Sequence, residues 1–345
     1  MITEPPSARP IQVSDASAVG QARRHATAVA EYVGLGGELA GNVSLIATEL
    51  AVNLHLHGGG GELLVSPLAG AIPGVQLLAI DRGRGMGDVE RCLTDGYSTA
   101  GTAGQGLGAI RRLSSRFEIH SRPGPGPLGG TVVLSQVLAR SVPPAAGEVE
   151  IGAVCVPVDG ETVCGDGWAA DGADGRCAVL VADGLGHGIL AAEASQAAIA
   201  VFRDRGEADP TAFLARAHAA LRPTRGAAAS IACIDLRRRT VRYAGVGNVA
   251  GRLVAEDRAR SMISHNGTLG LQIHRTVDAE YPWVEGGVLV MATDGLVTGW
   301  SVEGYAGLLR RHPAVIAAVL YRDWSRSRDD VTVVVVRIPP QAERA

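Results

Sequence analysis

Lysine is absent from all 345 residues, so arginine and histidine carry every positive side-chain charge. A P-loop, a protein-kinase ATP site and a Schiff-base enzyme each require a lysine. The sequence therefore excludes these three kinds of site.

A strong charge imbalance and long apolar runs are also missing. The formal net charge is −3 at pH 7, with 46% hydrophobic and 19% charged residues, which gives no electrostatic reason to bind nucleic acid. No window reaches about 18 uninterrupted apolar residues, and the first residues, Met-Ile-Thr-Glu-Pro-Pro, lack the features of a signal peptide. We expect a cytoplasmic protein with no nucleic-acid or membrane partner. Nothing in the sequence indicates its oligomeric state.

The sequence also lacks paired cysteine motifs. The five cysteines are irregularly spaced and form no Cys-x-x-Cys pattern of a zinc or redox site. We predict that all five are reduced residues of the core: Cys92, Cys155, Cys164, Cys177 and Cys233.

One Pro/Gly-rich segment divides the chain. Pro143-Pro144-Ala145-Ala146-Gly147 lies between two apolar runs, and the length suits two domains. We predict a first domain at 10–140, a linker at 141–147 and a second domain at 148–340.

Both domains are predicted to be α+β. In the first, two amphipathic helices precede four strand-like runs, which indicates helices on one mixed or antiparallel sheet. These elements are expected near 19–33, 43–54, 62–66, 75–80, 117–120 and 131–138. In the second, strands outnumber helices, and the helices are expected to cover the outer sheet faces. These elements are expected near 151–156, 178–182, 191–203, 210–221, 230–234, 241–244, 288–292 and 331–338.

Polar motifs in the first half follow an order typical of a nucleotide pocket. Glu49 and Asn53 share one face of a predicted helix, and Asp81 ends a predicted strand. A Glu/Asn pair alone would be a solvated helix face. Glycines that permit close backbone approach to phosphate follow Asp81 and open a later helix, whose N-terminus favours anions. They are Gly83, Gly85, Gly104, Gly106 and Gly108.

These motifs resemble the histidine-kinase and gyrase (GHKL, Bergerat-fold) ATPases, and within them the anti-sigma-factor serine kinases. The stretch from Leu93 to Gly101 is similar to RsbT-like switch kinases, and the resemblance covers roughly 10–138. It implies an ATP-binding α/β sandwich in which Asn53 holds Mg²⁺ on the phosphates, Glu49 orients or deprotonates a serine hydroxyl, and Asp81 reads adenine. A nucleotide sensor without kinase activity remains an alternative, because kinase activity also requires the glycine-containing segment before the later helix, the lid, to close over the nucleotide.

Four aspartates in the second half lie at the ends of apolar runs: Asp166, Asp183, Asp294 and Asp329. One such residue is usually a turn former or helix cap. Charges at the tips of buried strands are costly unless they are paired or bind cations, so four of them favour metal. Carboxylates without clustered His or Cys indicate Mg²⁺ or Mn²⁺. Two such ions about 3.5–4 Å apart can activate a water and clamp a phosphoryl group.

The aspartate motifs resemble type 2C serine/threonine phosphatases of the SpoIIE branch over about 148–338. They are Cys164-Gly165-Asp166, Asp183-Gly184, Thr293-Asp294-Gly295 and Asp329-Asp330-Val331-Thr332. The stretches 243–248 and 264–270 are similar to RsbX-like members. The resemblance implies an α-β-β-α sandwich, with catalytic roles for Asp183 and Asp294. It implies metal ligands at Asp166, Asp183, Asp294 and Asp329, and at the carbonyl of Gly184.

Some assignments stay open. Asp330 stands where the phosphatase family often has Asn, so either Asp329 or Asp330 is the ligand. His187 is a proton donor or supports its loop, and no catalytic role is assigned to the segment of His265 and Asn266. Candidate phosphate contacts are Arg82, Arg84 and Arg225.

Together the two resemblances imply a bifunctional kinase and phosphatase that uses ATP, Mg²⁺ and Mn²⁺. Its implied substrates are STAS-domain proteins, such as stressosome components or anti-anti-sigma factors. The alternative is a phosphatase whose first half senses ATP or binds a partner without catalysis.

Overall fold

The computed structural model describes residues 9–68, 72–93, 106–124, 128–140, 149–173, 175–205, 209–274, 276–326 and 328–338. The chain forms two compact units. The first unit comprises Ala8–Pro143 with Gly304–Arg311, which includes the 3₁₀ turn η1 at Leu308–Arg310. The second unit comprises Pro144–Glu303 with His312–Ala345. The predicted linker at 141–147 lies outside the described residues.

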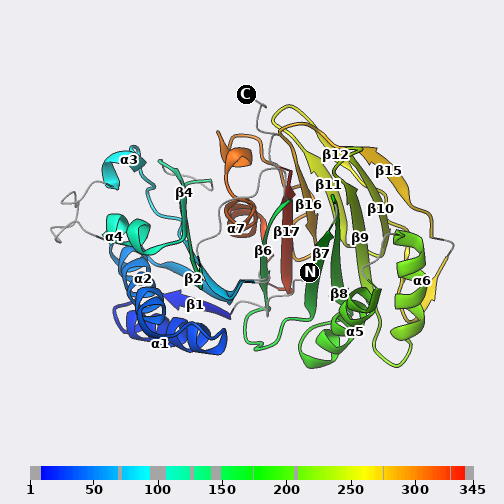
Figure 1. The fold of residues 1–345 in the computed structure, drawn as a ribbon, viewed down its shortest axis with the longest axis horizontal. Helices are drawn as coiled ribbons and strands as arrows, with labels where there is room; N and C mark the ends of the chain where they lie inside the picture. Colours follow the sequence, from blue (N-terminus) through cyan, green and yellow to red (C-terminus); the bar gives the residue numbers. More distant parts are fainter. Residues whose placement is uncertain are drawn as a thin grey trace. The chain divides into compact units, whose positions relative to one another are not determined.

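One antiparallel sheet forms the first unit, in the order β1-β2-β3-β5-β4 (Figure 1). Its strands are β1 (Arg9–Val13), β2 (Gly61–Pro67), β3 (Gly74–Ile80), β4 (Arg116–Arg122) and β5 (Gly130–Leu138). The four predicted strands are all present. The prediction missed β1, whose arginine and proline start conceals a short alternation that buries Ile11 and Val13.

Helices cover one face of this sheet. They are α1 (Ser17–Tyr32), α2 (Gly37–Leu56) and α4 (Gly106–Leu113), with the short α3 (Val89–Cys92). Buried alanines every fourth residue let α1 lie close to α2, whose apolar side chains fill the core above the sheet. Among the helices of the described residues, α2 has the length and apolar composition that could also cross a membrane. Here Ile46, Leu50 and Leu54 are buried in the core.

Two antiparallel sheets form the second unit. The first has the order β15-β10-β9-β8-β7 and the second the order β12-β11-β16-β17-β6. The first consists of β7 (Asp166–Ala173), β8 (Arg176–Gly184), β9 (Ala227–Asp235), β10 (Thr240–Val246) and β15 (Ala279–Pro282). The second consists of β6 (Glu150–Val156), β11 (Ala250–Val254), β12 (Ala259–Ser261), β16 (Val288–Ala292) and β17 (Val331–Arg337). A small ribbon pairs β13 (Gly267–Thr268) with β14 (Gln272–Ile273).

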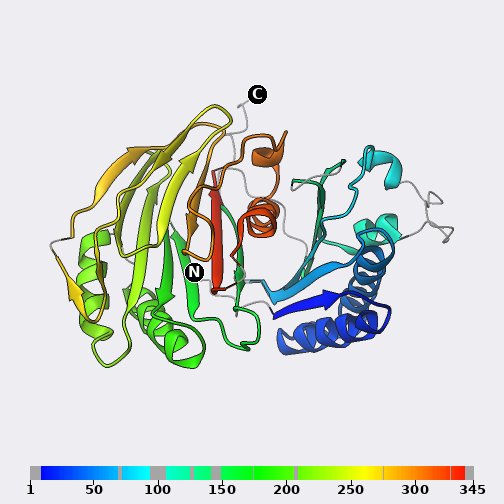
Figure 2. The same cartoon turned by 180° about the vertical axis from the view of Figure 1, so that it is seen from behind.

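Helices flank both sheets of the second unit, which gives the predicted α-β-β-α arrangement (Figure 2). The first sheet is covered by α5 (Ile189–Arg205) and α6 (Pro210–Ala220), whose Phe202 and Phe213 meet edge to face in the core. The second sheet is covered by α7 (Pro313–Trp324).

Among the described elements of the second unit, the prediction missed seven: β7, β11, β12, β13, β14, β15 and α7. Two of them, α7 and β7, were missed for opposite reasons. Residues Pro313 to Arg322 of α7 are all buried, so no polar stripe marks the helical period. Strand β7 reads Asp-Gly-Trp-Ala-Ala-Asp-Gly-Ala, which is poor in β-branched residues and rich in turn formers. Pairing with β8 along its whole length overrides that low local propensity.

Candidate active sites

Aspartates from both sheets of the second unit approach one another. Asp183 lies at the end of β8, Asp294 lies two residues beyond β16, and Asp329 lies two residues before β17. Asp166 opens β7 and pairs in register with Asp183. Asp166 therefore begins a strand and Asp329 precedes one, so the expectation that each ends an apolar run is wrong for these two residues. The antiparallel register, unavailable from the sequence, brings Asp166 beside Asp183.

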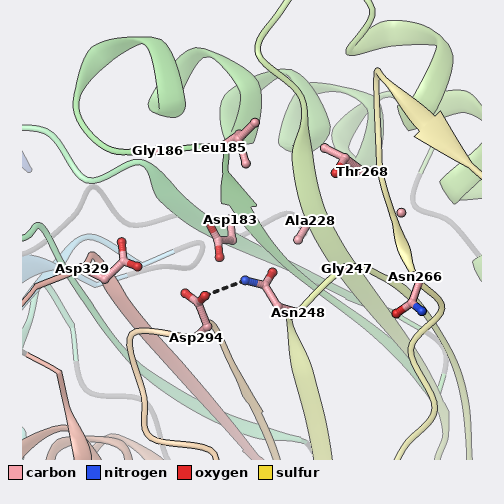
Figure 3. A pocket seen from close by; sticks show the side chains of 11 residues that line it. Asp183, Leu185, Gly186, Ala228, Gly247, Asn248, Asn266, Thr268, Asp294 and Asp329 are labelled. Carbon is pink, nitrogen blue, oxygen red and sulfur yellow. Dashed lines mark hydrogen bonds between the residues drawn. The ribbon is translucent and has the colours of Figure 1, made fainter.

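Three of these carboxylates line an open pocket of about 540 Å³. Figure 3 shows Asp183, Asp294 and Asp329 turned toward the same space. Loops and strand ends from the first sheet complete the lining: Leu185, Gly186, Ala228, Gly247, Asn248, Asn266, Gly267 and Thr268. Asn248 donates a hydrogen bond from Nδ2 to Oδ2 of Asp294 at 2.7 Å. An acidic pocket with an amide at its edge results.

Burial and mutual repulsion of these carboxylates lower the stability of the folded protein when no cation is bound. Burial, and then the negative charges of Asp294 and Asp329, raise the pKa of Asp183 to about 7. Burial and then Asp183 raise the pKa of Asp166, and burial and then Asp294 raise that of Asp329. Like charges gathered in a partly dry site favour a bound cation.

A divalent cation fits this donor set in chemistry and charge. The pocket offers hard carboxylate oxygens of the kind that Mg²⁺ and Mn²⁺ bind. No group of three or more His, Cys, Asp or Glu side chains in the described part of the chain forms a ready-made metal cage. The carboxylates thus converge on one pocket without already enclosing an ion.

Asp329 and Asp330 differ in what their side chains do. Asp330 is 2% exposed, and its two carboxylate oxygens accept the backbone N–H groups of Val158 and Gly165, each at 2.7 Å. Asp329 lines the pocket instead. The geometry favours Asp329 as the ligand and gives Asp330 the task of fixing the loop before Asp166.

The first unit brings Glu49, Asn53 and Gly106 together. A Cβ atom on Gly106, at the start of α4, would lie 3.0 Å from Oε2 of Glu49 and 3.6 Å from Oδ1 of Asn53. Nδ2 of Asn53 is buried and has no hydrogen-bond partner among the described residues. A buried amide without a described partner, beside a helix start where a side chain would crowd Glu49, fits a nucleotide phosphate and its Mg²⁺.

Asp81 lies just beyond β3, and its carboxylate shapes the following loop. Oδ1 accepts the N–H groups of Gly83 at 2.8 Å and Thr131 at 3.1 Å. Gly85 has φ +67°, and a Cβ there would lie 2.1 Å from the carbonyl oxygen of Arg122. The glycines thus permit a tight turn against β4. Gly108 is buried in α4, whereas Gly104 lies outside the described residues, as does most of the stretch 93–101.

Comparison with known proteins finds a matching family for each of the two units. A family model described as histidine kinase-like ATPase domain matches residues 13–136. The serine/threonine-protein kinase RsbT of Bacillus subtilis (strain 168) is 32% identical over 106 residues, which are 30% of this chain and 80% of RsbT. The chain belongs to the RsbT family of histidine kinase-like ATPases. We call its first unit the ATPase domain.

The second unit of this RsbT-family chain matches a different family. The model described as stage II sporulation protein E (SpoIIE) covers residues 173–339. The phosphoserine phosphatase RsbX of the same Bacillus strain is 36% identical over 91 residues, 26% of this chain and 46% of RsbX. A solved structure from work on the bacterial stressosome as a modular system has TM-score 0.51 and 28% identity, and covers 55% of this chain and all of that chain. The second unit is a SpoIIE-type phosphatase domain.

Glycines follow both aspartates of the Asp-Gly steps in the phosphatase domain because other backbone occupies their Cβ positions. A Cβ on Gly184 would lie 1.9 Å from the carbonyl oxygen of Ala191, and one on Gly295 would lie 2.0 Å from that of Asp330. The close approaches hold α5 and the start of β17 against Asp183 and Asp294. The two Asp-Gly steps therefore fix where the carboxylates stand.

Gly184→Ala is accordingly expected to destabilise the phosphatase domain by about 1–3 kcal/mol, because the backbone of α5 must move. Gly172→Ala in β7 is the matched control, since its nearest neighbour would lie at 3.4 Å. Urea denaturation of both variants measures the difference. Equal stabilities would contradict the packing role of Gly184.

Thr293 is a buried link that the sequence did not reveal, although it stood within a quoted motif. Its hydroxyl donates to Oδ2 of Asp166 at 2.7 Å and accepts the N–H of Thr332 at 2.9 Å. It joins the end of one sheet to a carboxylate on the other. Only the fold reveals this, because a threonine before an aspartate carries no distinctive pattern.

Thr293→Val is expected to lower the free energy of unfolding by about 1–3 kcal/mol, since it leaves the buried Thr332 N–H without a partner. Thr293→Ser keeps the hydroxyl and should retain most of that stability. Thermal denaturation of the two variants compares them. Retained stability in Thr293→Val together with a loss in Thr293→Ser would show that the methyl group, and not the hydrogen bonds, matters.

The histidines take supporting positions. Nδ1 of His187 lies 2.8 Å from Oε1 of Glu161, and His187 is exposed and is not among the pocket-lining residues. His265 is held by its backbone, whose N–H donates to Gly245 O at 2.8 Å. These contacts favour the loop-supporting interpretation of His187, and an isolated parallel bridge to Val246 holds His265 beside the pocket-lining Asn266.

Proposed function

We propose that this protein is a two-domain signalling switch that phosphorylates and dephosphorylates serine or threonine on a regulatory protein. The observation that carries the proposal is the convergence of Asp183, Asp294 and Asp329 on one open pocket in a SpoIIE-type domain. The similarity of the ATPase domain to a serine/threonine-protein kinase supports the phosphorylating activity. The proposed boundary between the activities is the segment 141–147.

In the phosphatase domain, Asp166, Asp183, Asp294 and Asp329, with the Gly184 carbonyl, would hold Mg²⁺ or Mn²⁺. When bound, these ions supply charge neutralisation at phosphorus and a water of lowered pKa. Asp183 and Asp294, whose positions are fixed by their strand ends, would help to hold these ions. Thr293 and Asp330 hold Asp166 and its loop in place.

In the ATPase domain, Asn53 would bind Mg²⁺ on the ATP phosphates, and Glu49 would orient or accept the proton of the attacking hydroxyl. Asp81 would accept the exocyclic amine of adenine. The glycines after Asp81 and at α4 would admit the phosphates: Gly83, Gly85, Gly104, Gly106 and Gly108. Positioning and charge neutralisation supply most of the acceleration in phosphoryl transfer.

The proposed substrates are STAS-domain proteins, because the relatives named RsbT and RsbX and the stressosome structure point to partner-switching pathways. We propose a cytoplasmic location on the same ground. A shared substrate would make simultaneous activity of both domains a futile hydrolysis of ATP. The two activities are therefore expected to alternate.

Intact-mass spectrometry tests the proposal directly. A STAS-domain protein encoded beside this gene is incubated with Mg-ATP and then with Mn²⁺, using wild type or Asp183→Asn. Addition of one phosphate by both proteins, and removal by wild type alone, is the expected result. If no phosphate is added but a phosphorylated partner loses its phosphate, the first domain is a nucleotide sensor or binding module. If neither step occurs, the proposed substrate class is wrong.

A further inference from the structure

An unpaired guanidinium stands at the edge of the phosphatase pocket. Arg225 is exposed and makes no ion pair or hydrogen bond with any residue in the described ranges. Its Nη1 lies 3.3 Å from the position a Cβ would take on Gly186, which lines the pocket. Its charge is therefore available to a ligand of the pocket.

Exposed leucines adjoin this arginine on either side. Leu185 is 54% exposed and lines the pocket, and Leu271 is 58% exposed. Gly226 lies between the two leucines. Its carbonyl oxygen accepts a hydrogen bond from the N–H of Leu185 at 3.0 Å. A Cβ atom on Gly226 would lie 3.2 Å from Cγ of Leu271. Leu185, Arg225 and Leu271 thus form one surface, which we call the pocket rim.

The apolar surface extends from the pocket rim onto the start of α5. Ile189 is 68% exposed and Leu190 is 47% exposed. The start of α5 packs on Gly184 through Ala191 and leaves both side chains exposed, although burial would stabilise them. Large exposed apolar side chains gathered beside a polar cleft indicate a surface that another protein covers.

We propose that the pocket rim docks a protein segment with a phosphorylated serine or threonine next to an apolar side chain, Arg225 binding the phosphate and Leu185 and Leu271 the apolar neighbour. The inference rests on the proposed function and adds the recognition chemistry. The charges are complementary: a phosphate dianion repelled by uncompensated carboxylates gains a guanidinium, which binds phosphate oxygens in a bidentate manner. The apolar contact would distinguish a protein substrate from a free phosphate ester.

Binding of a non-hydrolysable probe tests the pocket rim separately from catalysis. The probes are two peptides with a phosphonate analogue of phosphoserine, one flanked by leucine and one by serine, titrated calorimetrically with Mg²⁺ present. Arg225→Gln is expected to weaken both peptides about tenfold, the effect of one charge-assisted contact. Leu271→Ser is expected to weaken only the leucine-flanked peptide.

Matched controls are available on the same chain. Arg222→Gln removes an exposed arginine from the same loop, and Leu45→Ser removes a 56% exposed leucine from α2 of the ATPase domain. Binding by Arg225→Gln no weaker than by Arg222→Gln would overturn the phosphate contact. Equal weakening of both peptides by Leu271→Ser, or no binding of either peptide to wild type, would overturn the docking role.

Turnover of the matching phosphoserine peptides separates this inference from the proposed function. If wild type binds the phosphonate peptides as expected but does not hydrolyse the phosphoserine peptides with Mg²⁺ or Mn²⁺, the proposed function is wrong and the docking surface stands. If wild type hydrolyses them while Arg225→Gln binds and turns over like wild type, the phosphatase stands and the pocket rim is not its recognition surface.

Discussion

Asp183→Asn is expected to reduce Mn²⁺- or Mg²⁺-dependent hydrolysis of a phosphoserine substrate at least about 1000-fold, while the metal-free protein becomes more stable. Activity falls because the central carboxylate of the pocket can no longer hold a cation. Stability rises because the substitution removes a charge that burial and neighbouring carboxylates oppose. These opposite directions distinguish a metal ligand from a structural aspartate, whose loss would lower both.

The same carboxyl predicts the pH dependence of the metal-free protein. The pKa of Asp183 is about 7 in the folded state against an ordinary value of 3.8, so between these values the folded state binds the extra proton. Stability in EDTA should therefore fall as pH rises from about 4 to about 7. Asp183→Asn should flatten this slope. Thermal denaturation across that range measures it, and saturating Mn²⁺ should reverse the loss in wild type alone.

Retained activity in Asp183→Asn would contradict the metal assignment. A variant that loses activity and also unfolds at lower temperature in EDTA would show that Asp183 is structural. Ser195→Ala on α5 is a control for substitution near the first sheet, because within the described ranges its buried hydroxyl bonds only a carbonyl of its own helix. That variant should keep wild-type metal dependence.

Asn53→Ala is expected to weaken Mg-ATP binding at least about 100-fold, the loss of a metal ligand and its charge-assisted contacts. The fold should not suffer, because Nδ2 of Asn53 is buried without a described hydrogen-bond partner. Removing such a group costs little and can stabilise a protein. Calorimetric titration with Mg-ATP measures the affinity, and thermal denaturation without nucleotide measures the fold.

Asn42→Ala is the matched control, since Asn42 is also half-buried on α2 but lies three turns earlier. Its nucleotide affinity should equal that of wild type. Unchanged affinity in Asn53→Ala would remove Asn53 from the site. Loss of phosphotransfer with unchanged affinity would give Asn53 a role in the chemical step alone.

The sequence predicted those parts of the fold where hydrophobic period and residue type agree. The apolar stripe of α2 and the Val-rich β17 are clear by either criterion. Helix α7 was missed because complete burial removes the polar face that defines a helical period, and β7 because its residues favour turns. Tertiary contacts decide both elements, so no local pattern could have given them.

The candidate site residues also fall into two groups, those recognisable from the local sequence and those whose role depends on distant partners. Asp183 and Asp294 are marked by their place at the ends of apolar runs and Asp329 by its place before one, and the structure puts all three in one pocket. The roles of Thr293 and Asp330 depend on partners far away in the chain, such as the contact of Asp330 with Val158 at 172 residues' separation. Sequence order gives which residues are present, whereas strand register decides which of them meet.

The position of the aspartates at the ends of two separate sheets has a consequence for the life of the newly made chain. Thr293 reaches Asp166 across 127 residues, and Asp294 completes a pocket that Asp183 begins. Such long-range pairings form late, because much loop entropy must be lost before they exist. A ribosome-bound or half-folded chain therefore holds no assembled phosphatase site. Under the proposed function, hydrolysis would begin only once both sheets have joined, so a phosphorylated partner would not lose its phosphate while the chain is still being made.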